Sequence, residues 1–468
     1  MTSKAFRSYD LGQALLLPPS LDDWLPDDHL ARFVAEVVAT MDLTAFYASY
    51  RDGRGMAAYH PQLMVSLLVY GYCVGIRSSR KLEQACIEHV AFRYLSANAA
   101  PKHSAIAEFR RRHLTAMETL FAQVFELCRE AGLVSLGHVS IDGSKIRANA
   151  SKHKAVSWGR LEEREAHYRA LAEELLKDAE ACDSAEDATD NDDDSDLPQD
   201  WRRAEGRRAR LQEAKEALQQ RARERAREHA ERQQAKCDAI DERERETGSK
   251  HRGRRPSVPD PDLAEPSDRD QYNFTDPDSR IMKDGATKAF QQSYNAQIGV
   301  DADHGVIVGT YVTDHTNDKR ELLPAVAAIA ANNDGTLPSI ISADNGYYSD
   351  EAISAPELAA IDLYVPPDGA RRKAGRVSAV DPEQDPPPDD DAPPAERMRH
   401  KLNSDHGRKV YQMRKAIAEG PFGIIKEAMG FRRFSVRGFA AVSGEWNLVT
   451  AAYNLRKLFR ANKQAMIA

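Results

Sequence analysis

Residues 137–150, GHVSIDGSKIRANA, open with alternating apolar and polar side chains and then reach Asp142 and Gly143. Alternation with a period of two predicts a strand that buries one face, and a glycine directly after it favours a turn. We therefore expect a strand here with Asp142 at its far end.

Further strand patterns follow beyond residue 290. Residues 294–300 and 306–312 flank the turn 301–305 and predict a hairpin. The apolar run 339–344 predicts a buried strand that ends at Asp344, and residues 362–365 predict another short strand. Helical spacing of apolar residues predicts helices between these strands, at residues 319–332 and 350–360. This alternation predicts a mixed α/β core.

The chain before this core is expected to be helical, over residues 25–130. Pro61 fits the first turn of a helix, where its missing N–H costs nothing, and Ser78 or Ser79 would cap another. Two basic clusters, residues 75–84 and 101–113, accompany these helices. They are either solvated helix faces or the phosphate-contacting surface of a compact helical DNA-binding domain.

A long charged insertion separates the first strand from the others. Residues 158–182 and 201–247 favour helix and flank an acidic tract, which predicts an antiparallel helical hairpin. Residues 201–256 carry 18 Lys or Arg against 11 Asp or Glu. The hairpin is either a solvated, salt-bridged coiled coil or an arm that touches DNA or dimerises.

The net charge of the 468 residues is −8, which by itself counts against a nucleic-acid partner. However, residues 183–200 hold nine acidic and no basic residues, and residues 381–396 hold seven acidic residues, six prolines and no basic residue. Such tracts cannot bury a core. Without these two tracts the other 434 residues sum to +8, so the folded part is expected to be mildly basic.

The five cysteines are scattered and include no C-x-x-C pair, which argues against a disulfide framework or a cysteine zinc site. No apolar run is long enough for a membrane span, and the N-terminus lacks the apolar stretch of a signal peptide. We expect a cytoplasmic protein with no membrane partner.

Asp142 and Asp344 are the first candidates for chemistry. Carboxylates at the ends of neighbouring strands can converge on the roughly 4 Å that a pair of Mg²⁺ ions spans, which two-metal phosphoryl transfer requires. A third carboxylate on a following helix would complete the site. The candidate is Glu419, which lies with Tyr411, Arg414 and Lys426 in a segment whose donors suit DNA phosphate oxygens.

Several blocks of this sequence together resemble the DDE-type transposases of bacterial insertion sequences. The blocks are DGSKIRANAS (142–151), TDPDSR (275–280), YNAQ (294–297), DNGY (344–347), the segment from Tyr411 to Lys426, FRRF (431–434), VRG (436–438), and the residues from Glu445 to Lys457. Tyr59-His-Pro, GIRSSR (75–80) and FRRRH (109–113) resemble the helical N-terminal domain of the same group.

The resemblance implies an RNase H-like catalytic core in which Asp142, Asp344 and Glu419 hold two divalent ions, Mg²⁺ or Mn²⁺. It implies cleavage at terminal inverted repeats and joining of the freed 3′ ends to target DNA, by a homodimer or higher oligomer that synapses the ends at the nucleoid. The residues expected to bind DNA are Arg77, Arg80, Lys81, Arg110, Arg111, Arg112, Lys145, Tyr411, Arg414, Lys426, Arg432, Arg433 and Arg437.

Two points stay open. Pro421 removes a helical hydrogen bond, so we expect Glu419 at a kink or just before a helix that starts near Pro421, and Glu427 and Glu445 are rival third ligands. The chain is alternatively an RNase H-like nuclease without strand transfer, or a domesticated relative that only binds DNA.

The predicted fold class is α+β and multidomain, with a helical N-terminal DNA-binding domain and an RNase H-like mixed α/β core interrupted by a helical hairpin. The expected boundaries are 1–132 for the helical domain, 133–155 and 273–366 for the first two parts of the core, 156–272 for the insertion, 367–408 for a Pro/Asp-rich loop, and 409–468 for the C-terminal helices of the core.

Overall fold

The computed structural model describes residues 20–50, 57–167, 169–170, 199–251, 253–285, 287–367, 388–389 and 392–467. It divides the chain into two compact units, one formed by residues 1–149 with 293–468 and the other by residues 150–292. The insertion predicted at 156–272 therefore falls within the second unit.

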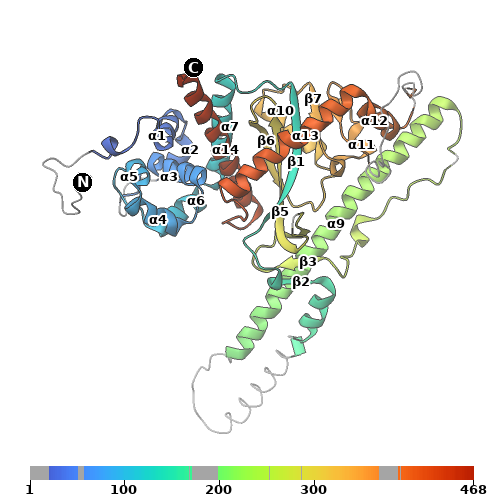
Figure 1. The fold of residues 1–468 in the computed structure, drawn as a ribbon. Coiled ribbons are helices and arrows are strands. Elements are labelled where there is room, and N and C mark those ends of the chain that lie inside the picture. Colours follow the sequence, from blue (N-terminus) through green and yellow to red (C-terminus); the bar gives the residue numbers. More distant parts are fainter. Residues whose placement is uncertain are drawn as a thin grey trace, which may run out of the picture. The chain divides into compact units, whose positions relative to one another are not determined.

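The N-terminal part of the first unit is helical, as predicted (Figure 1). Pro61 is the first residue of a helix that is buried on nearly all sides, and Gly75 ends this helix in the left-handed conformation that glycine adopts most easily. The elements are η1 (Asp22–Trp24), α1 (Leu30–Thr40), α2 (Thr44–Tyr47), α3 (Pro61–Val74), α4 (Ser79–Glu88), α5 (Val90–Leu95), α6 (His103–Arg112) and α7 (Leu114–Glu130).

A mixed sheet forms the centre of the first unit, in the order β6-β5-β1-β7-β8. The predicted hairpin is confirmed, since β5 and β6 are antiparallel, and β1 runs antiparallel to β5 but parallel to β7, which in turn is parallel to β8. The strands are β1 (His138–Arg147), β5 (Phe290–Asp301), β6 (Ile307–Thr313), β7 (Ile340–Ser342) and β8 (Asp362–Tyr364).

One predicted boundary in this sheet is wrong. β1 does not turn at Gly143 but continues to Arg147, because residues 139–147 pair with residues 293–301 of β5. Asp142 therefore lies in the middle of a strand. Its parallel partner β7 does end here, because the last residue of β7, Ser342, lies opposite Ser140.

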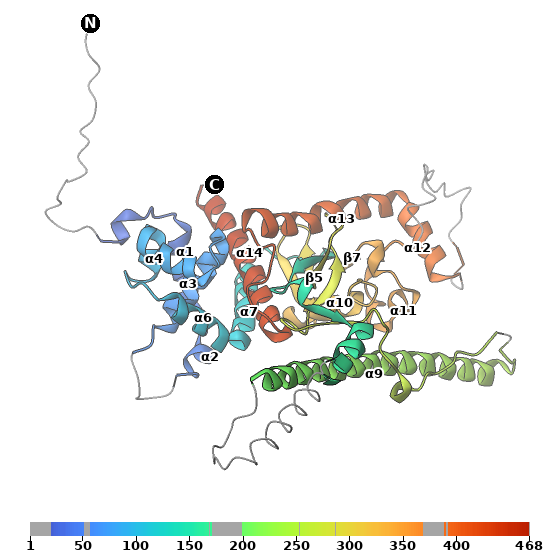
Figure 2. The ribbon, with the colours of Figure 1, turned by 90° about the horizontal axis from the view of Figure 1, so that it is seen from below.

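Helices cover both faces of the sheet (Figure 2). On one face, Gly299 and Gly309 leave room for Ile329 of α10 (Leu322–Asn332) to approach the strands closely. On the other face, α13 (Asp405–Gly423) packs against β1, β7 and β8. α14 (Phe439–Ile467) packs against α7, α3 and β6, which joins the helical part of this unit to its sheet.

The helix expected over residues 350–360 is two short pieces, α11 (Asp350–Ile353) and η5 (Pro356–Leu358). A residue that precedes proline avoids the helical conformation, and Ala355 is accordingly extended before Pro356. The remaining short elements of this unit are η4 (Asn345–Tyr347) and α12 (Pro394–Asn403).

The helix boundary expected at Pro421 is also wrong, because α13 runs through Pro421 to Gly423. The helix then changes to a π-helical turn, η6 (Ile424–Ala428). The missing N–H of proline already interrupts the α-helical hydrogen bonds, and π turns of this kind occur often at functional sites.

The second unit has a core of its own. It is built from β2 (Ala155–Ser157), β3 (Gln271–Asn273), the helical residues 158–167 and the 49-residue α9 (Gln199–Thr247). Val156, Leu161, Leu211, Leu218 and Tyr272 form its buried cluster. Lys215 of α9 pairs with Glu165 at 3.2 Å, so the helical residues 158–167 pack beside α9, whereas residues 171–198 of the predicted hairpin lie outside the described residues.

Other parts of the second unit are short. They are η2 (Lys152–Lys154), η3 (Pro261–Leu263) and β4 (Arg280–Lys283).

Most of the first acidic tract and most of the second lie outside the described residues. No helix among the described residues combines the length and the apolar character that a membrane span requires.

Candidate active site

The sheet register brings Asp142 and Asp344 to the same level. In the parallel pair β1 and β7, Ser140 lies opposite Ser342, and each aspartate follows two residues later. Asp344 caps the short helix η4, where its carboxylate accepts a hydrogen bond from the amide of Gly346 at 2.8 Å. The two strands thus present neighbouring carboxylates at the point where β7 ends.

Asp142 titrates far from its ordinary range. Burial raises the pKa of its carboxyl to about 7, and the negative charge of Asp344 raises it further. The positive charge of Arg414 and a hydrogen bond from the amide of Gly143 oppose this shift. Two carboxylates held together in a partly dry site are costly as anions unless a cation joins them.

α13 and the π turn run along the face of β1 that carries Asp142. At one end, the hydroxyl of Ser140 donates to the backbone oxygen of Arg414 at 3.5 Å. At the other end, the ammonium of Lys426 donates to the hydroxyl of Ser144. Since residues 140, 142 and 144 share one face of the strand, Asp142 lies between these two contacts. Glu419 lies between Arg414 and Lys426 in the chain.

The three acidic residues proposed for the third position have different surroundings. Glu445 is 2% exposed and accepts hydrogen bonds from the hydroxyl of Tyr72 and from the amide and hydroxyl of Ser435. Glu427 is exposed and pairs with Arg432 at 2.5 Å. Glu419 is exposed on α13 and has no hydrogen bond or ion pair within the described residues. Of these three carboxylates, that of Glu419 alone makes no hydrogen bond or ion pair with another described residue.

Asp318, which is not among the predicted site residues, lies in the loop between β6 and α10. Its Oδ1 atom accepts three hydrogen bonds, from Lys145 at 3.3 Å, Asn295 at 2.6 Å and Gln297 at 2.8 Å. These three donors lie on β1 and β5 and share the face opposite Asp142. The contact joins residues distant in sequence, so no local pattern could have revealed it.

The residues present fit a divalent cation at Asp142 and Asp344. Carboxylate oxygens are the ligands that Mg²⁺ prefers, and a cation would relieve the charge that raises the pKa of Asp142. Within the part of the chain that the structure describes, however, no three acidic, histidine or cysteine side chains stand close enough to hold a metal together. Glu419 would have to turn toward the two aspartates to complete a set of three.

Two of the side chains expected to bind DNA make contacts within the protein instead. Arg110 is 6% exposed and donates to the hydroxyl of Ser435 and the backbone oxygen of Arg77. Arg77 donates to the backbone oxygen of Gly430 at 2.7 Å and stacks over Phe431. These two arginines fix the segment 430–438 against α3 and α6, so their position favours a structural role over a surface one.

The other basic residues expected at DNA differ in their exposure. Arg414 is buried beside Tyr411, and Lys145 and Lys426 are half-buried. The exposed cations are Arg80, Lys81, Arg111, Arg112, Arg432, Arg433 and Arg437. Arg111 and Arg112 pair with Glu108, whereas Arg433 and Arg437 contact Asn149, two residues beyond β1.

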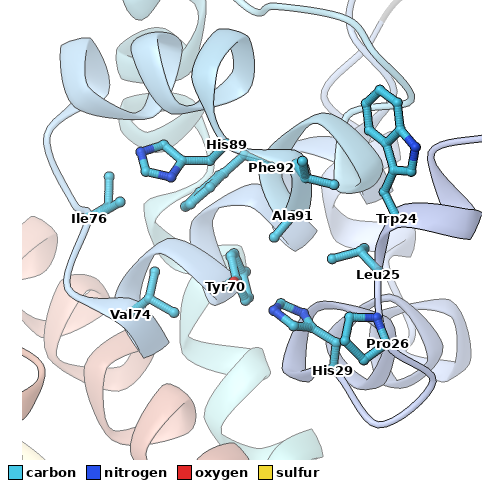
Figure 3. Close-up of a pocket in the computed structure, with 11 residues that line it drawn as sticks. Trp24, Leu25, Pro26, His29, Tyr70, Val74, Ile76, His89, Ala91 and Phe92 are labelled. Atoms are coloured by element: carbon cyan, nitrogen blue, oxygen red, sulfur yellow. The ribbon is translucent and has the colours of Figure 1, made fainter. Parts of the chain in front are cut away.

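A pocket of about 390 Å³ lies among the N-terminal helices (Figure 3). Aliphatic side chains and the aromatic side chains of Trp24, Tyr70 and Phe92 line it, together with His29 and His89. No charged carboxylate, lysine or arginine lines it. It holds none of the predicted site residues, so it is separate from the acidic site on the sheet.

Two parts of the chain match known protein families. Residues 19–112 match a family described as a transposase domain (DUF772), and residues 390–459 match a family described as a transposase DDE domain. The second match contains α13, the π turn and most of α14. No curated protein and no solved structure matches the chain.

Proposed function

We infer that this chain, which belongs to the DDE-type transposases of insertion sequences, cuts DNA at the terminal inverted repeats of its element and joins the 3′ ends to target DNA. The observation that carries the proposal is the pair Asp142 and Asp344, aligned by the register of β1 and β7 next to the transposase DDE match. The partner is double-stranded DNA, and the place of action is the nucleoid in the cytoplasm.

We assign the metal to Asp142 and Asp344, with Glu419 as the third ligand from α13. When bound there, two Mg²⁺ or Mn²⁺ ions supply activation of the attacking oxygen and stabilisation of the leaving oxygen. An RNase H-like core fits a mixed sheet in which β1 is antiparallel to β5 and parallel to β7. Glu419 is exposed, and to join the site its side chain would turn toward the two aspartates without breaking any contact within the described residues.

The basic residues beside the acidic pair would bind and orient the DNA backbone. Arg414 is fixed through packing against Tyr411 and offsets the negative charge near Asp142. Lys426 rests on the hydroxyl of Ser144 and can exchange this neutral partner for a phosphate oxygen, which forms a stronger, charge-assisted contact. Arg433 and Arg437 extend this surface past the end of β1.

The decisive experiment incubates the purified full chain with DNA carrying its own element ends and Mg²⁺, and maps nicks and joined products. Asp142→Ala, Asp344→Ala and Glu419→Ala should each lower cleavage by about 10³-fold or more, since each removes several kcal/mol of transition-state stabilisation. DNA affinity of these variants should stay within a few-fold of the parent protein. Cleavage that survives Glu419→Ala would remove that residue from the site.

The same assay separates transposition from simple hydrolysis. Joined products support strand transfer, whereas nicks without joining would assign the chain to DNA nucleases. DNA affinity should also fall steeply with salt, because phosphate contacts release counterions. An affinity that does not change between low and physiological salt would contradict a phosphate-binding surface. Two element ends held in one complex, measured by light scattering, would show the dimer or higher oligomer that synapsis requires.

A further inference from the structure

Asp318 is an acidic residue that the proposed triad does not use, yet it lies against the two segments that carry Asp142 and Asp344. A Cβ atom on Gly143, next to Asp142, would lie 3.0 Å from Asp318 Oδ1. A Cβ atom on Gly346, two residues after Asp344, would lie 3.7 Å from Asp318 Oδ2. The loop 314–321 therefore inserts this carboxylate between the two segments, and the two glycines leave the space it occupies.

The two oxygens of Asp318 have unequal surroundings. All three hydrogen bonds, from Lys145, Asn295 and Gln297, reach Oδ1. Within the described residues no hydrogen bond reaches Oδ2, which is the oxygen on the side of Gly346. The side chain of Asp318 is only 20% exposed, so water hydrates the charge on Oδ2 poorly. A carboxylate that is fixed through one oxygen presents the other in a defined direction.

Further contacts hold this arrangement rigid. The hydroxyl of Tyr347, in the turn after Asp344, donates to the side-chain oxygen of Gln297. The side-chain nitrogen of Gln297 therefore faces Asp318, and the side-chain oxygen of Gln297 faces Tyr347. Asn295 also donates to the backbone oxygen of His315 at 3.3 Å, which anchors the loop itself. The side chains of β5 thus tie the loop 314–321 to the turn that contains Asp344.

We propose that Asp318 is a positioning residue of the acidic site: Lys145, Asn295 and Gln297 fix its Oδ1 on the sheet face opposite Asp142, and its negative charge, next to Gly143 and Gly346, adds to the field that attracts the divalent cation. This inference rests on the proposed function and deepens it. Asp318 acts on the cation through the charge and the arrangement of the two ligand segments, in the way that outer carboxylates tune metal sites. Lys145 partly neutralises that charge.

The test measures Mn²⁺ binding to the full chain without DNA, by isothermal titration calorimetry. Asp318→Asn keeps the size of the side chain but removes its charge, and should weaken Mn²⁺ binding about 10- to 100-fold. Lys145→Gln removes the cation that neutralises Asp318, and should strengthen Mn²⁺ binding. These opposite signs are the signature of the proposal, because loss of a merely structural contact would weaken binding in both variants. Asp314→Asn, which removes the same charge four residues earlier in the loop, is the matched control.

Unchanged Mn²⁺ affinity in Asp318→Asn, or weaker affinity in Lys145→Gln, would overturn the proposal. If Asp318→Asn does not fold, Lys145→Gln retains Asp318 and decides the question alone. Asp142→Asn and Asp344→Asn belong in the same series. Loss of binding in these two variants but not in Asp318→Asn refutes only the role of Asp318, whereas unchanged binding in all three refutes the metal site of the proposed function.

Discussion

At the scale of single residues, Asp142 and His315 should both make stability fall as the pH rises, each in its own pH window. The pKa of Asp142 is raised to about 7 by burial and by Asp344. The pKa of His315 is raised chiefly by its hydrogen bond to the buried carboxylate of Glu321, 2.6 Å away. A raised pKa means that the folded protein binds the proton more tightly than the unfolded chain does.

For Asp142, the unfolded chain loses its proton near pH 4 and the folded protein near pH 7, so stability falls as the pH rises through this window. Asp142→Asn removes this dependence. Without divalent cations we expect the variant to be more stable than the parent at pH 8, by on the order of 3 kcal/mol, and equally stable at pH 4.

Chemical denaturation in the presence of a chelator measures this difference. Saturating Mg²⁺ should abolish or reverse it, because the parent then gains a ligand that the variant binds less well. A variant that is less stable than the parent at pH 8 without cations would show that the carboxylate of Asp142 is not under electrostatic strain.

For His315, the raised pKa contributes stability that is fully present below the unfolded pKa near 6.5 and is lost as the pH rises through the folded value. His315→Gln keeps a donor for Glu321 but cannot carry a charge. We expect it to cost about 1 kcal/mol at pH 6 and progressively less toward pH 9. Denaturation curves at the two pH values measure the difference, and a cost that does not change with pH would assign the effect to packing.

At the scale of elements, Glu445 connects three segments through its buried carboxylate. It lies on α14 and accepts hydrogen bonds from Tyr72 of α3 and from Ser435 in the segment 430–438. Arg110 of α6 donates to the same serine at 3.1 Å. Glu445 therefore stabilises the packing of α14 against α3.

Removing this carboxylate should destabilise the fold and leave the acidic site intact. Glu445→Ala leaves the buried hydroxyl of Tyr72 and the amide and hydroxyl of Ser435 without their acceptor, which we expect to cost about 3 kcal/mol. Thermal unfolding measures the loss, and Mn²⁺ titration of the folded variant should match the parent. Lost Mn²⁺ binding without a loss of stability would return Glu445 to the list of metal ligands.

Elements with local signals were predictable from the sequence. The hairpin of β5 and β6 follows from two alternating stretches and a glycine turn, and the start of α3 follows from Pro61. The end of β1 was not predictable, because its extension past Asp142 depends on pairing with residues 293–301. Helix formation across Pro421 likewise depends on packing of α13 against the sheet, which local propensity does not contain.

The candidate site likewise contains some residues that the sequence predicts and others that it does not. Asp142 and Asp344 are recognisable because each follows an apolar strand pattern. Asp318 is not recognisable, since Asn295 and Gln297 reach it from more than 20 residues away. Arg110 is misleading, because a run of three arginines suggests a solvent-facing surface and the first of them is buried against Ser435. Contacts of this kind arise only when the chain is folded.

At the scale of the whole molecule, the two units have separate cores, and this should be visible in their unfolding. The cluster around Leu218 contains only residues of the unit 150–292. Leu218 is 2% exposed, so Leu218→Ala leaves a cavity that we expect to cost about 2–5 kcal/mol. The unit 293–468 with 1–149 buries its own residues, among them Leu68 of α3, which is also 2% exposed.

Hydrogen exchange read by mass spectrometry can follow both units in one experiment. We expect Leu218→Ala to speed exchange in peptides from residues 150–292 and to leave β1, β5 and α14 protected, because cooperative units open independently when no shared core couples them. Leu68→Ala is the reciprocal control and should show the opposite pattern. If either variant sped exchange equally in both units, the chain would unfold as one cooperative body. The charged insertion would then contribute directly to the stability of the sheet that carries Asp142, and its deletion would destabilise the acidic site as well.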